Sequence, residues 1–202
     1  MSSVTIESFV QEYLGRLRRV VDELPLERVE AVGELLFTAY TEGKQVFVVG
    51  NGGSAATASH LTCDLAKATI GTNLPRLRIT SLSDNVPLLT ALANDAGYDH
   101  VFSEQLVGLL GEGDVLVVLS GSGRSPNVLE GMRFARSQSA RVVALLGFDG
   151  GAAAELADEH VVVPVDDYGL VEDVHMILGH VLTGYFRQRL RETGGRPPTP
   201  AG

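Results

Sequence analysis

The chain has 202 residues, of which 45% are hydrophobic and 20% charged, and its formal net charge is −9 at pH 7. This length and composition predict one globular domain with a sizeable buried core. The acidic balance argues against a general nucleic-acid or membrane-surface binder, which would need a basic face, although a local group of N–H donors can still bind a small anion.

In chain order, two helices are predicted first, at residues 6–22 and 26–40, because apolar side chains recur there at helical spacing. From there on, short β-branched runs alternate with helical patterns. The predicted strands are residues 45–49, 76–82, 114–120, 140–147 and 159–165. The predicted helices are residues 53–67, 86–93, 100–110, 126–137, 150–157 and 171–192. Near-continuous apolar strands alternating with helices predict an α/β protein, a three-layer α/β/α sandwich around a five-stranded parallel sheet.

Residues 1–190 show no internal repeat or linker, so we expect a single domain over 1–192, followed by a disordered Gly/Pro-rich tail at 193–202. Cys63 is the only cysteine, which excludes an intramolecular disulfide and favours a reducing compartment. The first residues lack the apolar core of a signal peptide, and no apolar run approaches the roughly 20 residues that span a bilayer. These features predict a cytoplasmic protein without a membrane partner.

Two Gly- and Ser-rich turns each follow a predicted strand and precede a predicted helix: GNGGS at 50–54 and SGSGRSPN at 120–127. Ligands bind at the carboxyl ends of parallel strands, and small residues let backbone N–H groups approach an anion. One such turn alone is equally typical of a plain strand-to-helix connection, but two at neighbouring strand ends favour a phosphate site. The hydroxyls expected to bind the phosphate belong to Ser54, Ser120, Ser122 and Ser125.

The first turn also satisfies the loose dinucleotide pattern GxGxxG/A, as GNGGSA. That pattern expects an acidic residue about 20 residues further on, whereas the nearest candidate, Asp84, lies well beyond that point. No Gly-Lys-Ser/Thr follows the turn, so it is not a P-loop. A sugar phosphate is therefore favoured over a nicotinamide cofactor.

His60 and Asp64 lie four residues apart on a predicted helix and share a face. Alone, such a pair is more often a hydrogen-bonded surface or interface pair than a metal site. Glu172 and His180 on the apolar last helix complete a mixed nitrogen and oxygen set suited to zinc or another divalent metal. Their Cα atoms are about 12 Å apart on a straight helix, so both reach one metal more easily if Glu172 lies in a loosened first turn. His175, about 140° round the helix from His180, is predicted to be a packed or interface histidine.

Four segments together resemble the phosphoheptose isomerases, or sedoheptulose 7-phosphate isomerases, of the sugar isomerase (SIS) domain family. They are VVGNGGSAATASHLTCDL, SLSDNVPLLTALANDAGYDHVFSEQL, SGSGRSPNVLEGM and VEDVHMILGHVL, and the resemblance covers about residues 5–190. It implies the SIS fold with flavodoxin-like winding, extra N-terminal helices and a long C-terminal helix. It also implies a homotetramer with active sites at subunit interfaces.

The same resemblance implies an aldose–ketose isomerase that converts sedoheptulose 7-phosphate, a sugar phosphate, to a D-glycero-heptose 7-phosphate. Carried over by position, the four serines would hold the phosphate, while Asn51 and Asp95 would line the sugar site. The family's zinc ligands and acid/base residues fall at His60, Asp64, Glu172 and His180.

Three positions depart from the family pattern. The family usually has Glu where this chain has Asp64, Gln where it has Glu172, and often an acidic residue at Gly169. Asp64 has about 1.5 Å less reach than Glu, and Glu172 adds a negative charge beside the metal. The assignment of the base therefore stays open between these two carboxylates.

Isomerisation moves a proton between C1 and C2 through an enediol, which requires a base, an acid and stabilisation of the enediolate. We expect Asp64 to be the base and His180 the acid, with Glu172 as the rival base and the divalent metal as Lewis acid. Two other functions stay open: a non-catalytic SIS protein that binds a sugar phosphate as a regulator, and an isomerase of another ketose phosphate.

Overall fold

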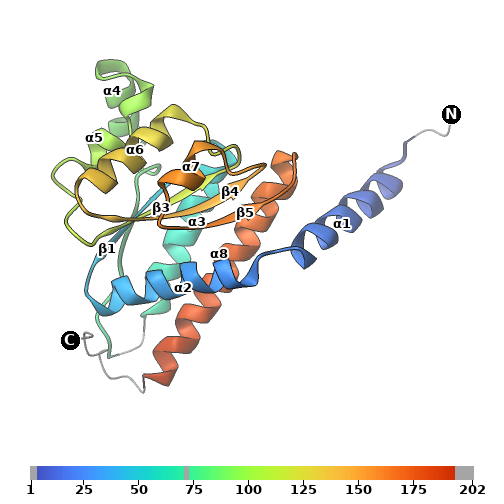
Figure 1. Ribbon diagram of the computed structural model, residues 1–202, viewed down its shortest axis with the longest axis horizontal. Helices are drawn as coiled ribbons and strands as arrows, with labels where there is room; N and C mark the ends of the chain where they lie inside the picture. The colour runs from blue at the N-terminus through green and yellow to red at the C-terminus, as the bar shows by residue number, and fades with distance from the viewer. Residues whose placement is uncertain (1–3, 71–72, 194–202) are drawn as a thin grey trace.

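The sheet is built as the alternating pattern predicts. A computed structural model describes residues 4–70 and 73–193 and contains one five-stranded parallel sheet in the order β2-β1-β3-β4-β5 (Figure 1). This is the flavodoxin-like winding, in which ligands bind where the strand order reverses, between β1 and β3. The strands are β1 (Gln45–Val49), β2 (Arg78–Ser81), β3 (Val115–Ser120), β4 (Arg141–Gly147) and β5 (Glu159–Val163).

Helices cover both faces of the sheet, and their bounds mostly match the predicted ranges. Two details were wrong. The predicted helix at 100–110 is only a 3-10 turn and one short α-helix, because Gly97 and Gly108 take positive φ values on either side of them. The elements are α1 (Ile6–Asp22), α2 (Leu26–Thr41), α3 (Gly53–Ala68), α4 (Val86–Asp95), η1 (Tyr98–His100), α5 (Ser103–Leu106), α6 (Pro126–Ser137), α7 (Gly151–Leu156) and α8 (Tyr168–Glu192).

The second wrong detail concerns the start of the last helix. Asp167 caps α8 by accepting the N–H groups of Gly169 and Leu170, so the helix begins at Tyr168, three residues earlier than predicted. Glu172 therefore lies inside regular helix and not in a loosened first turn.

Strand side chains alternate between two buried clusters, one on each face of the sheet. Val46 and Val48 of β1 pack with α2, α3 and α8, whereas Phe47 and Val49 pack with the layer that contains α4–α7. The sheet is thus buried on both faces, which leaves the ends of the strands as the place for a polar site.

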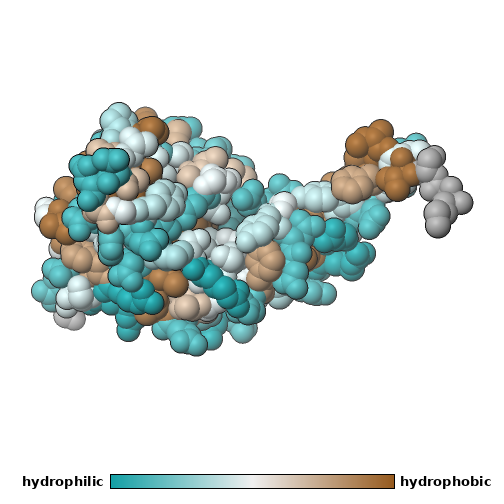
Figure 2. All heavy atoms as spheres, turned by 90° about the horizontal axis from the view of Figure 1, so that it is seen from above, coloured by the Kyte–Doolittle hydropathy of each residue, from teal (hydrophilic) through white to brown (hydrophobic). Residues whose placement is uncertain are grey.

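The first helix extends away from this body as an arm (Figures 1 and 2). It is held to the body from its middle onward: the Tyr13 hydroxyl donates to Asp173, and Arg16 pairs with Asp167. Its far end carries exposed apolar side chains, which Figure 2 shows as a brown patch. They are Val4, Ile6, Phe9, Val10 and Leu14.

Nearly all of the predicted tail, residues 194–202, lies outside the described residues. Within 4–70 and 73–193, no helix combines the length and the apolar character that crossing a membrane would require.

Candidate active site

The two Ser/Gly turns meet at the carboxyl end of the sheet. Val49 of β1 lies beside Val118 of β3, so the turns that follow these strands are neighbours. Together they enclose a cavity of about 110 Å³. It is lined by Asn51, Ser54, Leu119, Ser120, Gly121, Ser122, Ser125, Tyr168 and Glu172. All four predicted phosphate-binding serines, and Asn51, therefore line one cavity.

The backbone of the first turn needs glycine. Gly52 has φ +55, which favours glycine, and a Cβ on Gly50 would lie 2.5 Å from the carbonyl oxygen of Ser54. This close turn starts α3 directly behind β1 and buries Ser54 in the first turn of the helix, where the first N–H groups have no acceptor within the helix itself. Such N–H groups and hydroxyls form an anion site.

The hydroxyls of the second turn differ in what they already bind. The N–H of Gly123 donates to Ser120 Oγ (3.1 Å), and the N–H of Arg124 donates to Ser122 Oγ (3.3 Å). Ser125 precedes α6 but its hydroxyl makes no capping bond to that helix. A hydroxyl that accepts a backbone N–H still has its own proton to donate, so all three can donate to a phosphate oxygen.

Two residues that the sequence did not indicate hold Asn51 in place. Asn51 Oδ1 accepts from Asn127 Nδ2 (2.9 Å) and from the Tyr98 hydroxyl (3.0 Å), and Asn51 Nδ2 donates to Asn127 Oδ1 (2.9 Å). Asn127 is buried and lies two residues after Ser125, in the turn already identified, which was a usable signal. Tyr98, by contrast, lies in η1, and its position in the sequence did not indicate that it would contact Asn51.

The first turns of α8 form one side of the serine cavity. A Cβ on Gly53 would overlap the carboxylate of Glu172, so this side chain lies directly on the first residue of α3. A Cβ on Gly121 would lie 2.8 Å from the ring of Tyr168, which also packs on Phe148 with ring centroids 4.8 Å apart. Tyr168 was not predicted, although it lies four residues before Glu172 and hence on the same helix face.

Two imidazoles and a carboxylate converge where α3 packs on α8. His60 Nε2 and His180 Nε2 are 2.9 Å apart, and Asp64 Oδ2 lies 3.3 Å from the first and 3.9 Å from the second. Tetrahedral ligands 2.0–2.1 Å from a zinc ion lie about 3.3 Å apart, so this set fits a divalent metal. In the part of the chain that the structure describes, these three residues are the group able to hold one.

The predicted four-residue metal set is thus divided. His60, Asp64 and His180 come together, whereas Glu172 lines the serine cavity and is absent from the cluster. Eight residues of regular helix separate Glu172 from His180, about 12 Å along the axis, which is the physical reason for the division.

Asp64 is the most buried member of the cluster, with its side chain 19% exposed, whereas the two imidazoles are about half exposed. Burial raises the pKa of Asp64, but the hydrogen bond from Lys67 and the nearby charges of His60 and Lys67 outweigh it, and the pKa lies below its ordinary value. Asp64 is therefore ionised at neutral pH, as a metal ligand or a base must be. The contact with Lys67 (3.3 Å) weakens it as a base.

The remaining predicted residues lie elsewhere. Asp95 is exposed at the end of α4, where it accepts from the side chain of Asn94, and it does not line the serine cavity. His175, on α8, is buried, as expected for a packed histidine.

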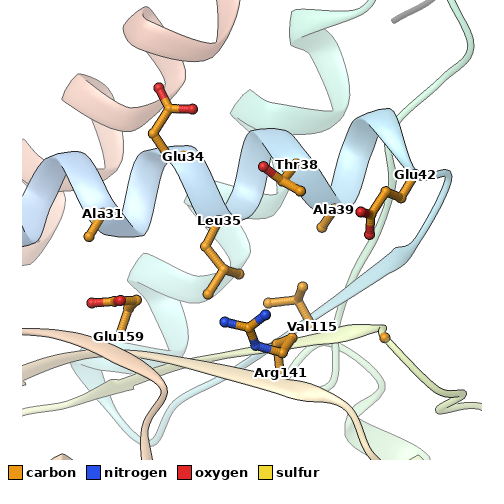
Figure 3. Close-up of a pocket in the computed structure, with 10 residues that line it drawn as sticks. Ala31, Glu34, Leu35, Thr38, Ala39, Glu42, Val115, Arg141 and Glu159 are labelled. Atoms are coloured by element: carbon orange, nitrogen blue, oxygen red, sulfur yellow. The ribbon is translucent and has the colours of Figure 1, made fainter. Parts of the chain in front are cut away.

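A larger cavity, of about 360 Å³, lies at the opposite end of the sheet (Figure 3). It is formed by one face of α2 and by the first residues of three strands, Val115, Arg141 and Glu159. Leu35 points into it from the helix (Figure 3). Parallel sheets bind ligands at the carboxyl ends of their strands, and none of the predicted site residues lines this cavity, so the serine cavity is the better site.

Comparisons with known proteins show relatives in both sequence and fold. Residues 8–147 match the family model described as SIS domain. The phosphoheptose isomerase of Geotalea daltonii is 39% identical over 185 residues, which cover 92% of this chain and 95% of that protein. The structure of a phosphoheptose isomerase from Neisseria gonorrhoeae is similar with a TM-score of 0.85 at 30% identity, covering 91% of this chain and all of that one. A phosphoheptose isomerase structure from Francisella tularensis gives 0.84 at 26% identity, covering 92% and 100%.

Proposed function

The chain belongs to the phosphoheptose isomerases of the SIS domain family, and we propose from this premise that it converts sedoheptulose 7-phosphate to a D-glycero-heptose 7-phosphate. The observation that carries the proposal is that one helix joins both parts of the site. α3 starts at the serine cavity, and its residues His60 and Asp64 follow Ser54 by about 9 and 15 Å along the axis. A seven-carbon sugar phosphate is long enough to bridge the nearer part of that span.

The serine cavity binds the phosphate in this proposal. Ser54, Ser120, Ser122 and Ser125 donate hydroxyl protons, and the start of α3 adds backbone N–H groups. Binding at this end, remote from the reacting carbons, positions C1 and C2 and so contributes to catalysis without touching them. Asn51, held by Asn127, faces the next part of the substrate; the role of Asp95 in the sugar site requires a neighbouring subunit or a movement of α4.

Asp64 takes the proton from the substrate carbon, and His180 protonates the oxygen on the other side and assists ring opening. The exposed imidazole of His180 lies within 3.9 Å of Asp64, so both groups reach one enediol. A divalent metal, zinc or another, held by His60, Asp64 and His180 would supply Lewis-acid stabilisation of the enediolate. Glu172, which lines the serine cavity and is absent from this cluster, is the rival base.

We further propose a homotetramer with active sites at subunit interfaces. The exposed apolar end of α1 supports it, because a monomer would leave this patch in water. An apolar groove between α2 and α8, lined by Val29, Gly33, Val181 and Leu182 among others, supports it as well. The proposal also includes a cytoplasmic location and a single domain over 1–192.

Incubation with sedoheptulose 7-phosphate in D₂O tests the reaction. We expect a heptose 7-phosphate product that carries deuterium at the exchanging carbon, detected by NMR and mass spectrometry. A panel of five-, six- and seven-carbon ketose phosphates separates this activity from that of another ketose phosphate isomerase. Binding of the sugar phosphate with neither exchange nor product would instead identify a non-catalytic SIS protein.

Two variants assign the base, with a third as a matched control. Asp64→Asn and Glu172→Gln each remove one carboxylate charge, and Asp22→Asn does so at an exposed position at the end of α1. We expect D64N to be inactive with its metal retained, E172Q to turn over substrate, and D22N to match the wild type. An active D64N and an inactive E172Q would instead identify Glu172 as the base. Elemental analysis should find one divalent ion per chain, and full activity without metal would refute the metal site.

A further inference from the structure

Glu172 lines the cavity that the phosphate of the substrate would enter, and its carboxylate lies against the start of α3. A Cβ on Gly53 would overlap this carboxylate, and Glu172 lines the same cavity as the four serines. Because α8 is capped by Asp167 and regular from Tyr168 onward, the position of Glu172 is set by a rigid element. The backbone of Glu172 is therefore held beside the cavity and the first residue of α3.

Phosphate and this carboxylate favour the same place. Gly53 is the first residue of α3, where the N–H groups lack acceptors in the helix and the helix dipole favours negative charge. The nine residues that line the cavity include neither Lys nor Arg, so no lining cation offsets a second negative charge. The adjacent Arg124 is already paired with Asp149.

We propose that Glu172 is an internal anion of the phosphate cavity, which stabilises the start of α3 in the free protein and competes with phosphate for it. Glu172 thereby sets the affinity for the phosphate end of the substrate and favours ligands whose binding outweighs the repulsion. The identity of the ligand as a phosphate rests on the proposed function.

Titration calorimetry with inorganic phosphate tests this directly, at low ionic strength, on the wild type, E172Q and E172M. Both variants keep a side chain of similar length and remove the charge. Each should bind phosphate tighter by about tenfold or more, because the repulsion between two unit charges about 4 Å apart changes a binding constant by a factor of about five in bulk water and about a thousand near a protein surface. Glu192→Gln is the matched control, since it makes the same change on the same helix about 30 Å away, beyond the screening length.

Two further readouts separate charge from shape. The ratio of the E172Q and wild-type affinities should fall towards one as NaCl is raised, whereas an effect of shape would not depend on salt. Without phosphate, E172Q should melt at a lower temperature than the wild type, and added phosphate should raise its melting temperature more. The opposite signs of these two effects are the signature of a competing internal anion.

Unchanged or weaker phosphate binding by both E172Q and E172M would overturn the proposal, as would a complete lack of phosphate binding in all three proteins. Binding detected only in the variants would support it. The outcome is independent of turnover: a protein that fails to isomerise sedoheptulose 7-phosphate but binds phosphate tighter as E172Q refutes the proposed function and supports this inference.

Discussion

Acidification should destabilise the protein through one buried side chain, His175. Its imidazole is 1% exposed on α8, and among the described residues only the backbone of Leu146 interacts with the ring strongly enough to oppose the effect of burial. Burial lowers the pKa of His175 from 6.5 to about 4, with the backbone of Leu146 opposing the shift only in part. The ring is therefore neutral in the folded protein at pH values where it is protonated in the unfolded chain.

The direction of the effect follows from this difference in proton binding. Between pH 6.5 and about 4 the unfolded chain binds more protons at His175 than the folded protein, so the free energy of unfolding falls as the pH falls. Each pKa unit corresponds to about 1.4 kcal/mol. Moving from pH 7.5 to pH 5 should therefore remove about 2 kcal/mol through this residue.

Urea unfolding at pH 7.5 and pH 5 of the wild type and His175→Leu measures this contribution, with a chelator present so that metal binding does not differ between samples. Leu removes the titrating group and keeps an apolar side chain in the core. The loss of stability on acidification should be about 2 kcal/mol smaller in H175L than in the wild type. His100→Leu, which removes an exposed imidazole, should behave like the wild type. An equal acid loss in H175L and the wild type would refute the reasoning.

Three other changes test the site and the assembly. Lys67→Gln removes the ammonium that lowers the pKa of Asp64, so the acid limb of the kcat/KM profile should move to higher pH; a limb that does not move would show that Asp64 is not the titrating base. Gly121→Val drives a side chain into the Tyr168 ring, so KM should rise several-fold and recover in G121V/Y168A. A double variant as impaired as G121V would exclude the ring as the cause. Phe9→Glu places a charge in the exposed apolar patch of α1, so sedimentation should show a smaller assembly than the wild type; an unchanged mass would exclude this patch from the interface.

Local patterns were sufficient for most of the fold. The runs VFVV and VLVVL are too apolar to lie anywhere but in a sheet covered on both faces, and alternation with helices implies a parallel sheet. The turn after each of these strands is marked by its own glycines and serines. The exception, residues 100–110, shows the limit: apolar spacing indicated a helix, but Gly97 and Gly108 in left-handed backbone conformations end it on both sides.

The sequence was likewise sufficient to predict which residue types form the candidate site, but not how they are arranged in space. Helical spacing predicts that His60 and Asp64 share a face, because two residues four apart on one helix lie on the same side of it. Which residue of α8 completes the cluster depends on how two helices pack, and it is His180, 120 residues further on. The capped, regular start of α8 keeps Glu172 about 12 Å along the axis from His180 and sets it on Gly53 instead. Spacing along a chain specifies the faces of single elements. Only packing between elements specifies which faces meet, and it placed Asp64 beside His60 and His180 and Glu172 in the serine cavity.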